Sequence, residues 1–245
     1  MSTGAAPEPG EEPHSWPAQL PRRLAAHLDR QVGDPATGRL AGAALVVANP
    51  VLDRPGWDGT VRSLRATIEP EGRIVIGVAP RLAEALAAGL AELPEASAVE
   101  VAAALPALVG QPEGRVYRGL MRWATTPVDL PDAGVWLEHT DPRVPAWLHP
   151  FGGQALVALD GERHLAGVGI KRHDEHGWEL AVVTDETARG RGLARRLVAQ
   201  AARHVLDAER VPVYLHGPDN LASARVADAA GFGWQGWWVM GLATS

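Results

Sequence analysis

The segment of residues 178–202, WELAVVTDETARGRGLARRLVAQAA, constrains the fold more than any other part of the chain. An apolar strand pattern ends at Thr184, a short loop with two glycines follows, and an amphipathic helix pattern starts at Gly192. A junction of this kind points several unpaired backbone N–H groups out of the positive end of a helix dipole. The sequence therefore predicts an anion-binding loop, in which the glycines let a phosphate approach and the arginines add positive charge.

Three kinds of phosphate-binding loop compete for this segment. A P-loop ends in Gly-Lys-Ser/Thr, whereas the chain's one lysine is Lys171, outside the loop. A Rossmann loop needs a third glycine and a parallel βαβ unit. Here the third glycine is missing, and the loop follows three successive patterns typical of antiparallel strands, at residues 154–159, 165–171 and 178–184. The pyrophosphate loop of an acyl-CoA-dependent transferase is the option that remains.

The rest of the chain has an α/β pattern that divides at Gln111-Pro112-Glu113-Gly114, a run of turn-forming residues. We expect a disordered tail at residues 1–20, an N-terminal α/β subdomain at 21–112 and a second domain at 113–245. Strand patterns also occupy residues 40–48, 73–78, 115–125, 211–215 and 234–242. Helix patterns occupy residues 22–31, 81–93, 99–109 (with a break at Pro106), 141–148, 192–208 and 221–230.

Two motifs in the second domain resemble those of one family. Arg189-Gly190-Arg191-Gly192-Leu193-Ala194 looks like the R/Q-x-x-G-x-G/A motif of the GNAT superfamily of N-acetyltransferases, and the segment from Asn220 to Ser223, followed by Gly231-Phe232, resembles its N-x-x-A/S … G-F motif. The resemblance covers about residues 115–242. It implies a mixed, mainly antiparallel sheet flanked by helices.

The resemblance also implies the chemistry. Family members move an acetyl group from acetyl-CoA to a primary amine by direct attack, so we expect an acyl-CoA-dependent N-acyltransferase. A backbone N–H near Val183 would stabilise the oxyanion. By analogy with the family, the residues that would hold acetyl-CoA are Val182, Val183, Thr184, Arg189, Gly190, Arg191, Gly192, Leu193, Ala194, Asn220 and Ser223.

The catalytic acid and base are less clearly marked. Glu179 opens the strand before the loop, where family members often carry a glutamate that acts as the general base. His216, at the end of the next strand, is the second candidate base. Either residue could be structural instead. The tyrosine that usually protonates the thiolate is replaced by Ala227, so Ser223 is the candidate acid. This departure leaves an alternative function open, a non-catalytic acyl-CoA-binding or scaffolding module.

Composition narrows the partners. The chain has no cysteine, which excludes disulfides, Cys-ligated zinc and a cysteinyl acyl-enzyme. The net charge is −6 and no block of basic residues occurs, so we expect no nucleic-acid partner, and a mild preference for a cationic acceptor. No apolar run is long enough to span a membrane and no signal peptide is apparent, so we expect a cytoplasmic protein. The cluster of polar residues at 173–176 is typical of a tight turn, so no metal is expected.

Several expectations stay open at this level. The acceptor is a small-molecule amine or a peptide or protein amine, and a homodimer is possible. The first half could be a degenerate second transferase-like half, a cover for the acceptor site or a dimer surface. Trp234, Trp237 and Trp238 in the last strand are core residues by default, with an aromatic acceptor pocket as the alternative.

Overall fold

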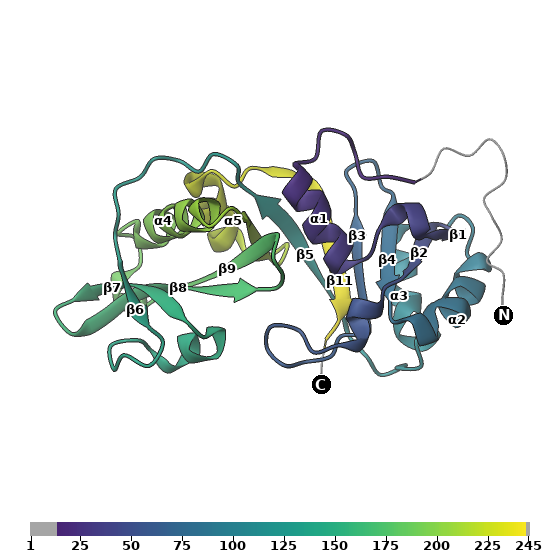
Figure 1. Cartoon of the computed structure of the whole chain (residues 1–245), viewed down its shortest axis with the longest axis horizontal. Helices are drawn as coiled ribbons and strands as arrows, with labels where there is room; N and C mark the ends of the chain where they lie inside the picture. The colour runs from purple at the N-terminus through teal and green to yellow at the C-terminus, as the bar shows by residue number, and fades with distance from the viewer. Residues whose placement is uncertain (1–13, 244–245) are drawn as a thin grey trace.

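The computed structural model describes residues 14–243, which form one continuous, strongly extended sheet with helices on both faces (Figure 1). The order of the strands across the sheet is β1-β2-β4-β3-β11-β5-β10-β9-β8-β7-β6. Their bounds are β1 (Arg39–Ala41), β2 (Ala44–Ala48), β3 (Leu64–Ile68), β4 (Ile74–Val78), β5 (Val116–Trp123), β6 (Val135–Glu138), β7 (Gln154–Asp160), β8 (Arg163–Arg172), β9 (Gly177–Thr184), β10 (Val211–His216) and β11 (Trp234–Leu242).

The sheet is mixed and mainly antiparallel, which confirms the predicted fold class. Strand β2 runs parallel to β4, and β9 runs parallel to β10, while the other neighbours are antiparallel. The last strand of the chain, β11, lies between β3 of the first half and β5 of the second (Figure 1). The backbone hydrogen bonds of the sheet therefore run without interruption from one half of the chain to the other.

Helices cover each part of the sheet with apolar side chains. Their bounds are α1 (Arg22–Gln31), α2 (Pro80–Ala91), α3 (Ala98–Leu108), α4 (Leu193–Asp207) and α5 (Leu221–Ala230). Helices α2 and α3 pack on the N-terminal strands, and α4 and α5 on one face of the C-terminal strands. Helix α1 packs Leu24 and Leu28 on the opposite face of the C-terminal strands, against Val213 and Trp237. The first helix thus contributes to the core of the second half.

Some predicted elements differ from the structure. Strands β3 and β6 were not predicted, and the predicted strand at residues 40–48 is divided by a turn at Gly42, whose φ is +55°. The predicted helix at residues 141–148 is instead a 3₁₀ segment, Ala146–Phe151, because Pro145 and Pro150 remove hydrogen-bond donors. Helix α3, by contrast, runs past Pro106 to Leu108.

The tail predicted at residues 1–20 lies only partly within the described residues. Residues 1–13 lie outside the described residues, but Trp16 and Leu20 pack against the core cluster that contains Trp237. The indole Nε1 of Trp16 donates a hydrogen bond of 2.7 Å to Asp29. Between residues 14 and 243, no helix has both the length and the apolar character needed to cross a membrane.

Candidate active site

The loop between β9 and α4 leaves its backbone amides free. Gly190 and Gly192 have φ of +79° and +72°, in the left-handed region that glycine enters without steric cost. Gly192 is the N-cap of α4, and no side chain caps the helix there. Within the part of the chain that the structure describes, no residue accepts a hydrogen bond from the amides of residues 190–195. These amides, at the positive end of α4, have the geometry of an anion-binding site.

Strands β9 and β10 separate beside this loop. Their parallel pairing ends at Leu180 and Tyr214. Beyond that point β9 continues to Thr184 and β10 to His216, each held only by its outer neighbour, β8 or β5. The edge of β9 at residues 181–184 therefore faces a gap and has no partner strand there.

A groove of about 940 Å³ runs along this gap and past the loop to the start of α5. Asn220 caps α5, as predicted, by accepting a hydrogen bond of 3.0 Å from the amide of Ser223. The groove is lined by all of the residues that the sequence assigned to acyl-CoA: Val182, Val183, Thr184, Arg189, Gly190, Arg191, Gly192, Leu193, Ala194, Asn220 and Ser223.

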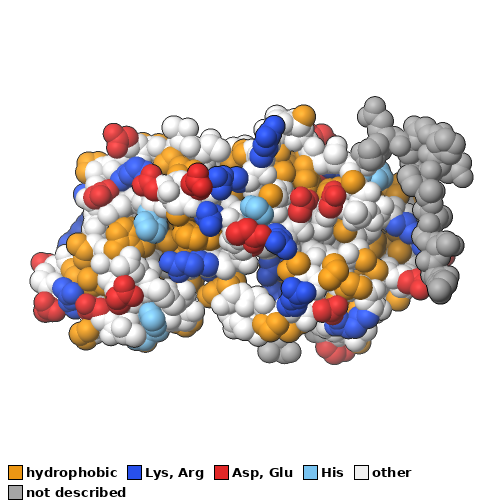
Figure 2. Space-filling model, in the orientation of Figure 1, with side chains coloured by type: hydrophobic (Ala, Val, Ile, Leu, Met, Phe, Trp, Pro, Cys, Tyr) orange, Lys and Arg blue, Asp and Glu red, His pale blue; other side chains and the backbone are white. Residues whose placement is uncertain are grey.

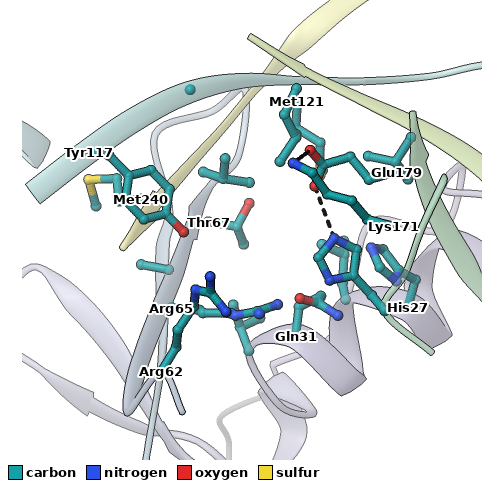
Figure 3. A pocket seen from close by; sticks show the side chains of 18 of the residues that line it. His27, Gln31, Arg62, Arg65, Thr67, Tyr117, Met121, Lys171, Glu179 and Met240 are labelled. Carbon is teal, nitrogen blue, oxygen red and sulfur yellow. Dashed lines mark hydrogen bonds and ion pairs between the residues drawn. The ribbon is translucent and has the colours of Figure 1, made fainter. Parts of the chain in front are cut away.

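A separate cavity of about 400 Å³ lies on the opposite face of the sheet, under α1 (Figure 3). Its walls come from both halves of the chain: α1, the loop before β3, β3 itself, and strands β5, β8, β9, β10 and β11. Glu179 of β9 and Val213 of β10, which pair with each other, both line it. The place where β9 and β10 separate thus has the groove on one face and the cavity on the other.

Glu179 is the acidic group of this cavity, and its side chain is buried. Its Oε2 lies 2.9 Å from Nε2 of His173, and its Oε1 accepts a hydrogen bond from the ammonium of Lys171. Burial by itself would raise the pKa of Glu179, but the hydrogen bond from His173 and the charge of Lys171 outweigh burial and hold the pKa at about 2. Burial lowers the pKa of His173 despite its contact with Glu179. At neutral pH the cavity therefore contains an ionised Glu179 beside a neutral imidazole.

The sequence model of the family described as "Acetyltransferase (GNAT) family" matches residues 119–232. This range starts within β5 and ends at Phe232, after α5, so it includes the splayed strands and the loop between them. Residues 119–232 form a GNAT acetyltransferase domain.

Several solved structures of GNAT proteins are similar to parts of this chain. A protein described as an acetyltransferase from the GNAT family of Novosphingobium aromaticivorans is 24% identical, over 53% of this chain and 66% of its own, with a TM-score of 0.42. A GNAT acetyltransferase from Colwellia psychrerythraea is 12% identical over 76% and 82%, with a TM-score of 0.45. A tandem GNAT protein from the clavulanic acid biosynthesis pathway is 15% identical over 69% and 73%, with a TM-score of 0.38. No curated protein matches the sequence.

The surroundings of His216 in the GNAT domain argue against its predicted role as a base. Nε2 of His216 accepts a hydrogen bond of 2.9 Å from Nε of Arg122, and Nδ1 lies 2.9 Å from the carbonyl oxygen of Gly217. Because a guanidinium can only donate, Nε2 must be the unprotonated nitrogen and Nδ1 must carry the hydrogen. The lone pair that a base needs is therefore already occupied in this buried ring.

The predicted acid, Ser223, lies beside Tyr214, which no motif of the sequence marks. The hydroxyl of Tyr214 donates to Oγ of Ser223 at 3.4 Å, and both residues line the groove of the GNAT domain. Burial raises the pKa of Tyr214, which keeps the phenol protonated. Ala227, at the usual tyrosine position, is buried in the core. Strand alternation could have indicated Tyr214, since it sets this side chain on the face opposite Val213 and Leu215.

Local sequence patterns also fail to indicate several polar groups of the cavity beside Glu179. The sequence pattern places His173 in a tight turn and does not mark Lys171, Arg65 or Tyr117, yet all of them line the cavity. Between residues 14 and 243, no group of three or more His, Cys, Asp and Glu side chains is arranged to hold a metal ion. None of the three tryptophans of β11 lines the cavity: Trp237 is buried, Trp238 packs on the N-terminal core, and Trp234 is exposed.

Proposed function

We propose that the protein is an acyl-CoA-dependent N-acyltransferase that moves an acetyl group from acetyl-CoA to a primary amine by direct attack. The observation that carries the proposal is the set of unpaired amides at residues 190–195, which belong to residues that line the groove along the free edge of β9. A diphosphate is the kind of anion that such a helix N-terminus binds, and Arg189 and Arg191 add positive charge. The free edge at residues 181–184 suits an extended pantetheine arm, which would add to it like a strand.

On the acceptor side, we assign the removal of the amine's proton to His173 and Glu179 acting together. An amine must lose its proton before it can attack a thioester carbonyl. An ionised Glu179 can only accept, so Nε2 of His173 carries a hydrogen and Nδ1 is the basic atom of the neutral ring. A carboxylate with a pKa of about 2 is too weak a base to take this proton itself. Glu179 is therefore a positioning residue that orients His173 and stabilises its protonated form.

On the CoA side, the thioester would supply the acyl group within the gap between β9 and β10. A backbone N–H near Val183, on the free edge of β9, would stabilise the oxygen that becomes negative as the amine attacks. When the carbon–sulfur bond breaks, the thiolate needs a proton or a hydrogen-bond donor. The Ser223 hydroxyl, which is itself hydrogen-bonded by Tyr214, would supply it.

The first half of the chain would act as one wall of the acceptor site. Helix α1 contributes His27 and Gln31 to the cavity, and β3 contributes Arg65 and Thr67. Among the roles open to residues 21–112, these contacts favour a cover for the acceptor site. The cavity next to Glu179 would then be complete only when both halves are present.

Calorimetry with acetyl-CoA tests the first step. We expect saturable binding that is competed by CoA, and no binding at millimolar ligand would end the proposal. Release of CoA thiol above background with a library of amines tests the second step. Tight binding of CoA with no release for any amine would support the alternative, a non-catalytic acyl-CoA-binding module, for which the buried Ala227 at the usual tyrosine position is the reason.

A further inference from the structure

The cavity beside Glu179 is positively charged, although the chain has a net charge of −6. Charged side chains of both signs are interspersed over the face of the molecule shown in Figure 2, so the cavity does not simply extend a basic surface. Glu179 is the single carboxylate among the residues that line the cavity. The permanently charged cations of the lining are Arg62, Arg65, Arg118 and Lys171.

Two of these cations already have partners. Lys171 is paired with Glu179, and Arg62 donates two hydrogen bonds, of 2.8 and 2.6 Å, to the carboxylate of Asp58. Arg118 lies over the ring of Trp238, 5.0 Å from its centroid, and its buried Nε has no hydrogen-bond partner. Arg65 has neither an ion pair nor a cation–π contact with any residue between 14 and 243. Arg65 is thus the cation of the cavity whose charge is least compensated.

Arg65 is held in a position where an unpaired charge is costly. It lies on β3, its Nε is fully buried without a partner, and burial lowers its pKa. Buried polar groups are normally hydrogen-bonded, and a buried charge without a counter-charge destabilises a fold. In Figure 3 the guanidinium groups of Arg65 and Arg62 and the hydroxyl of Tyr117 point into the cavity from one side, and Glu179 and Lys171 lie on the other.

We propose that the acceptor is a small amine that also carries an anionic group, carboxylate or phosphate, which Arg65 binds with the help of Arg62 and Tyr117. The inference rests on the proposed function, because it takes this cavity as the acceptor site. A guanidinium presents a fork of donors that matches either anion. The amine end would lie toward Glu179 and His173, beside the gap between β9 and β10.

The charge and the volume of the cavity narrow the acceptor beyond what the sequence indicated. A purely cationic amine, which the net charge mildly favoured, would meet the uncompensated charge of Arg65. A volume of about 400 Å³ is near the lower end of the range for small-molecule sites, and it suits a molecule of amino-acid size. The anionic group neutralises Arg65 upon binding, so recognition and charge compensation are the same event.

Matched pairs of amines test the proposal. Release of CoA thiol from acetyl-CoA is measured with each amine. The carboxylate pairs are alanine and alaninamide, glutamate and its diamide, and 4-aminobutyrate and its amide. O-phosphoethanolamine against ethanolamine tests phosphate. We expect the anionic member of at least one pair to be favoured in kcat/KM by about tenfold or more. The carboxylate and phosphate pairs show which of the two anions is recognised.

The substitution Arg65→Gln tests which residue is responsible. We expect it to raise KM for the anionic acceptor by about tenfold or more, and to leave the KM of acetyl-CoA and the neutral member of the pair nearly unchanged. Arg65→Lys, which keeps the charge without the fork, should recover part of the loss. Arg39→Gln, at an exposed arginine of β1, is the matched control and should change neither value.

If amines release CoA, two outcomes would overturn the inference. One is a preference for the neutral members of every pair, and the other is an equal loss for both members in Arg65→Gln. If no amine releases CoA, the acyltransferase proposal fails at that step. Calorimetry with the same amines then tests whether the cavity binds an anionic group. Binding of anionic members to the unmodified chain and not to Arg65→Gln would support the site, and no binding of any anionic member would refute it.

Discussion

His27 and Asp174 are 147 residues apart in the sequence, yet Nδ1 of His27 lies 2.7 Å from Oδ2 of Asp174 and both side chains are buried. Gln31, one turn further along α1, also donates to Oδ2 of Asp174, at 3.0 Å. Asp174 lies in the turn between β8 and β9, next to His173. Helix α1 is thereby attached to the GNAT domain at the wall of the cavity beside Glu179.

This attachment predicts that His27→Ala weakens both the fold and the acceptor site. The substitution leaves the buried carboxylate of Asp174 without one of its partners, which should cost about 1–3 kcal/mol of unfolding free energy. We expect KM for the acceptor to rise while KM for acetyl-CoA stays the same. Urea denaturation and steady-state kinetics measure the two effects. Arg30→Ala is the control on the same helix, because its pair with Glu175 is exposed and should contribute no more than about 1 kcal/mol.

The substitution Gly192→Asp tests the anion-binding loop. It places a carboxylate at the N-terminus of α4 on a residue with φ of +72°, where the new Cβ would also lie 3.0 Å from Nε of Arg195. We expect the affinity for acetyl-CoA to fall by about a hundredfold or more, because the new carboxylate would lie where the diphosphate binds and would repel it. Gly161→Asp is the control, at a glycine of similar φ, +60°, in the turn between β7 and β8. An unchanged affinity in Gly192→Asp would argue against the site.

The lowered pKa of Glu179 predicts that acid reduces the stability of the fold. Its pKa is lowered from 4.5 to about 2, because the contacts with His173 and Lys171 outweigh the opposing effect of burial. A carboxyl group with a lowered folded-state pKa stabilises the fold above its unfolded pKa, and this stabilisation is lost as pH falls through the folded value. We expect the unfolding free energy to decline between about pH 4.5 and 2, and to decline less steeply in Glu179→Gln.

Asp174 should keep part of this acid sensitivity in the variant. Burial opposes ionisation of Asp174, but the hydrogen bond from His27 lowers its pKa to about 2. Denaturant titrations at several pH values, on the unmodified chain and on Glu179→Gln, measure both slopes. Identical slopes would mean that Glu179 is not held ionised by its neighbours.

Two histidines should respond differently to the same substitution. His173→Asn removes the proposed base and should lower kcat by about 10²–10⁴-fold. His216→Asn should leave kcat within about an order of magnitude, but should cost about 1–3 kcal/mol of stability, because a buried donor of Arg122 loses its acceptor. Stopped-assay kinetics and urea denaturation of both variants separate the roles. A loss of kcat in His216→Asn as large as that in His173→Asn would restore His216 as a base.

The sequence predicted those parts of the site that depend on residues close together in the chain. The glycines of the loop, the cap at Asn220 and the end of α5 at Gly231 were predicted from local patterns, and the structure has the same features. Each depends on backbone angles or on a hydrogen bond within about three residues, so neighbouring residue types suffice to specify it. The order of hairpins, helix and strand in the second half was predicted for the same reason.

The cavity beside Glu179, by contrast, was decided by the tertiary structure. Arg65 lines the same cavity as Glu179 only because β11 pairs with β3 on one side and β5 on the other. His216 loses its lone pair to Arg122 because β5 and β10 pair side by side in the sheet. Strand pairing between distant segments is set by the packing of the whole sheet, and a short segment such as β3 carries too little of that information. The sequence by itself therefore determined the glycine-rich loop at the start of α4, and only the folded chain decided which charges line the cavity beside Glu179.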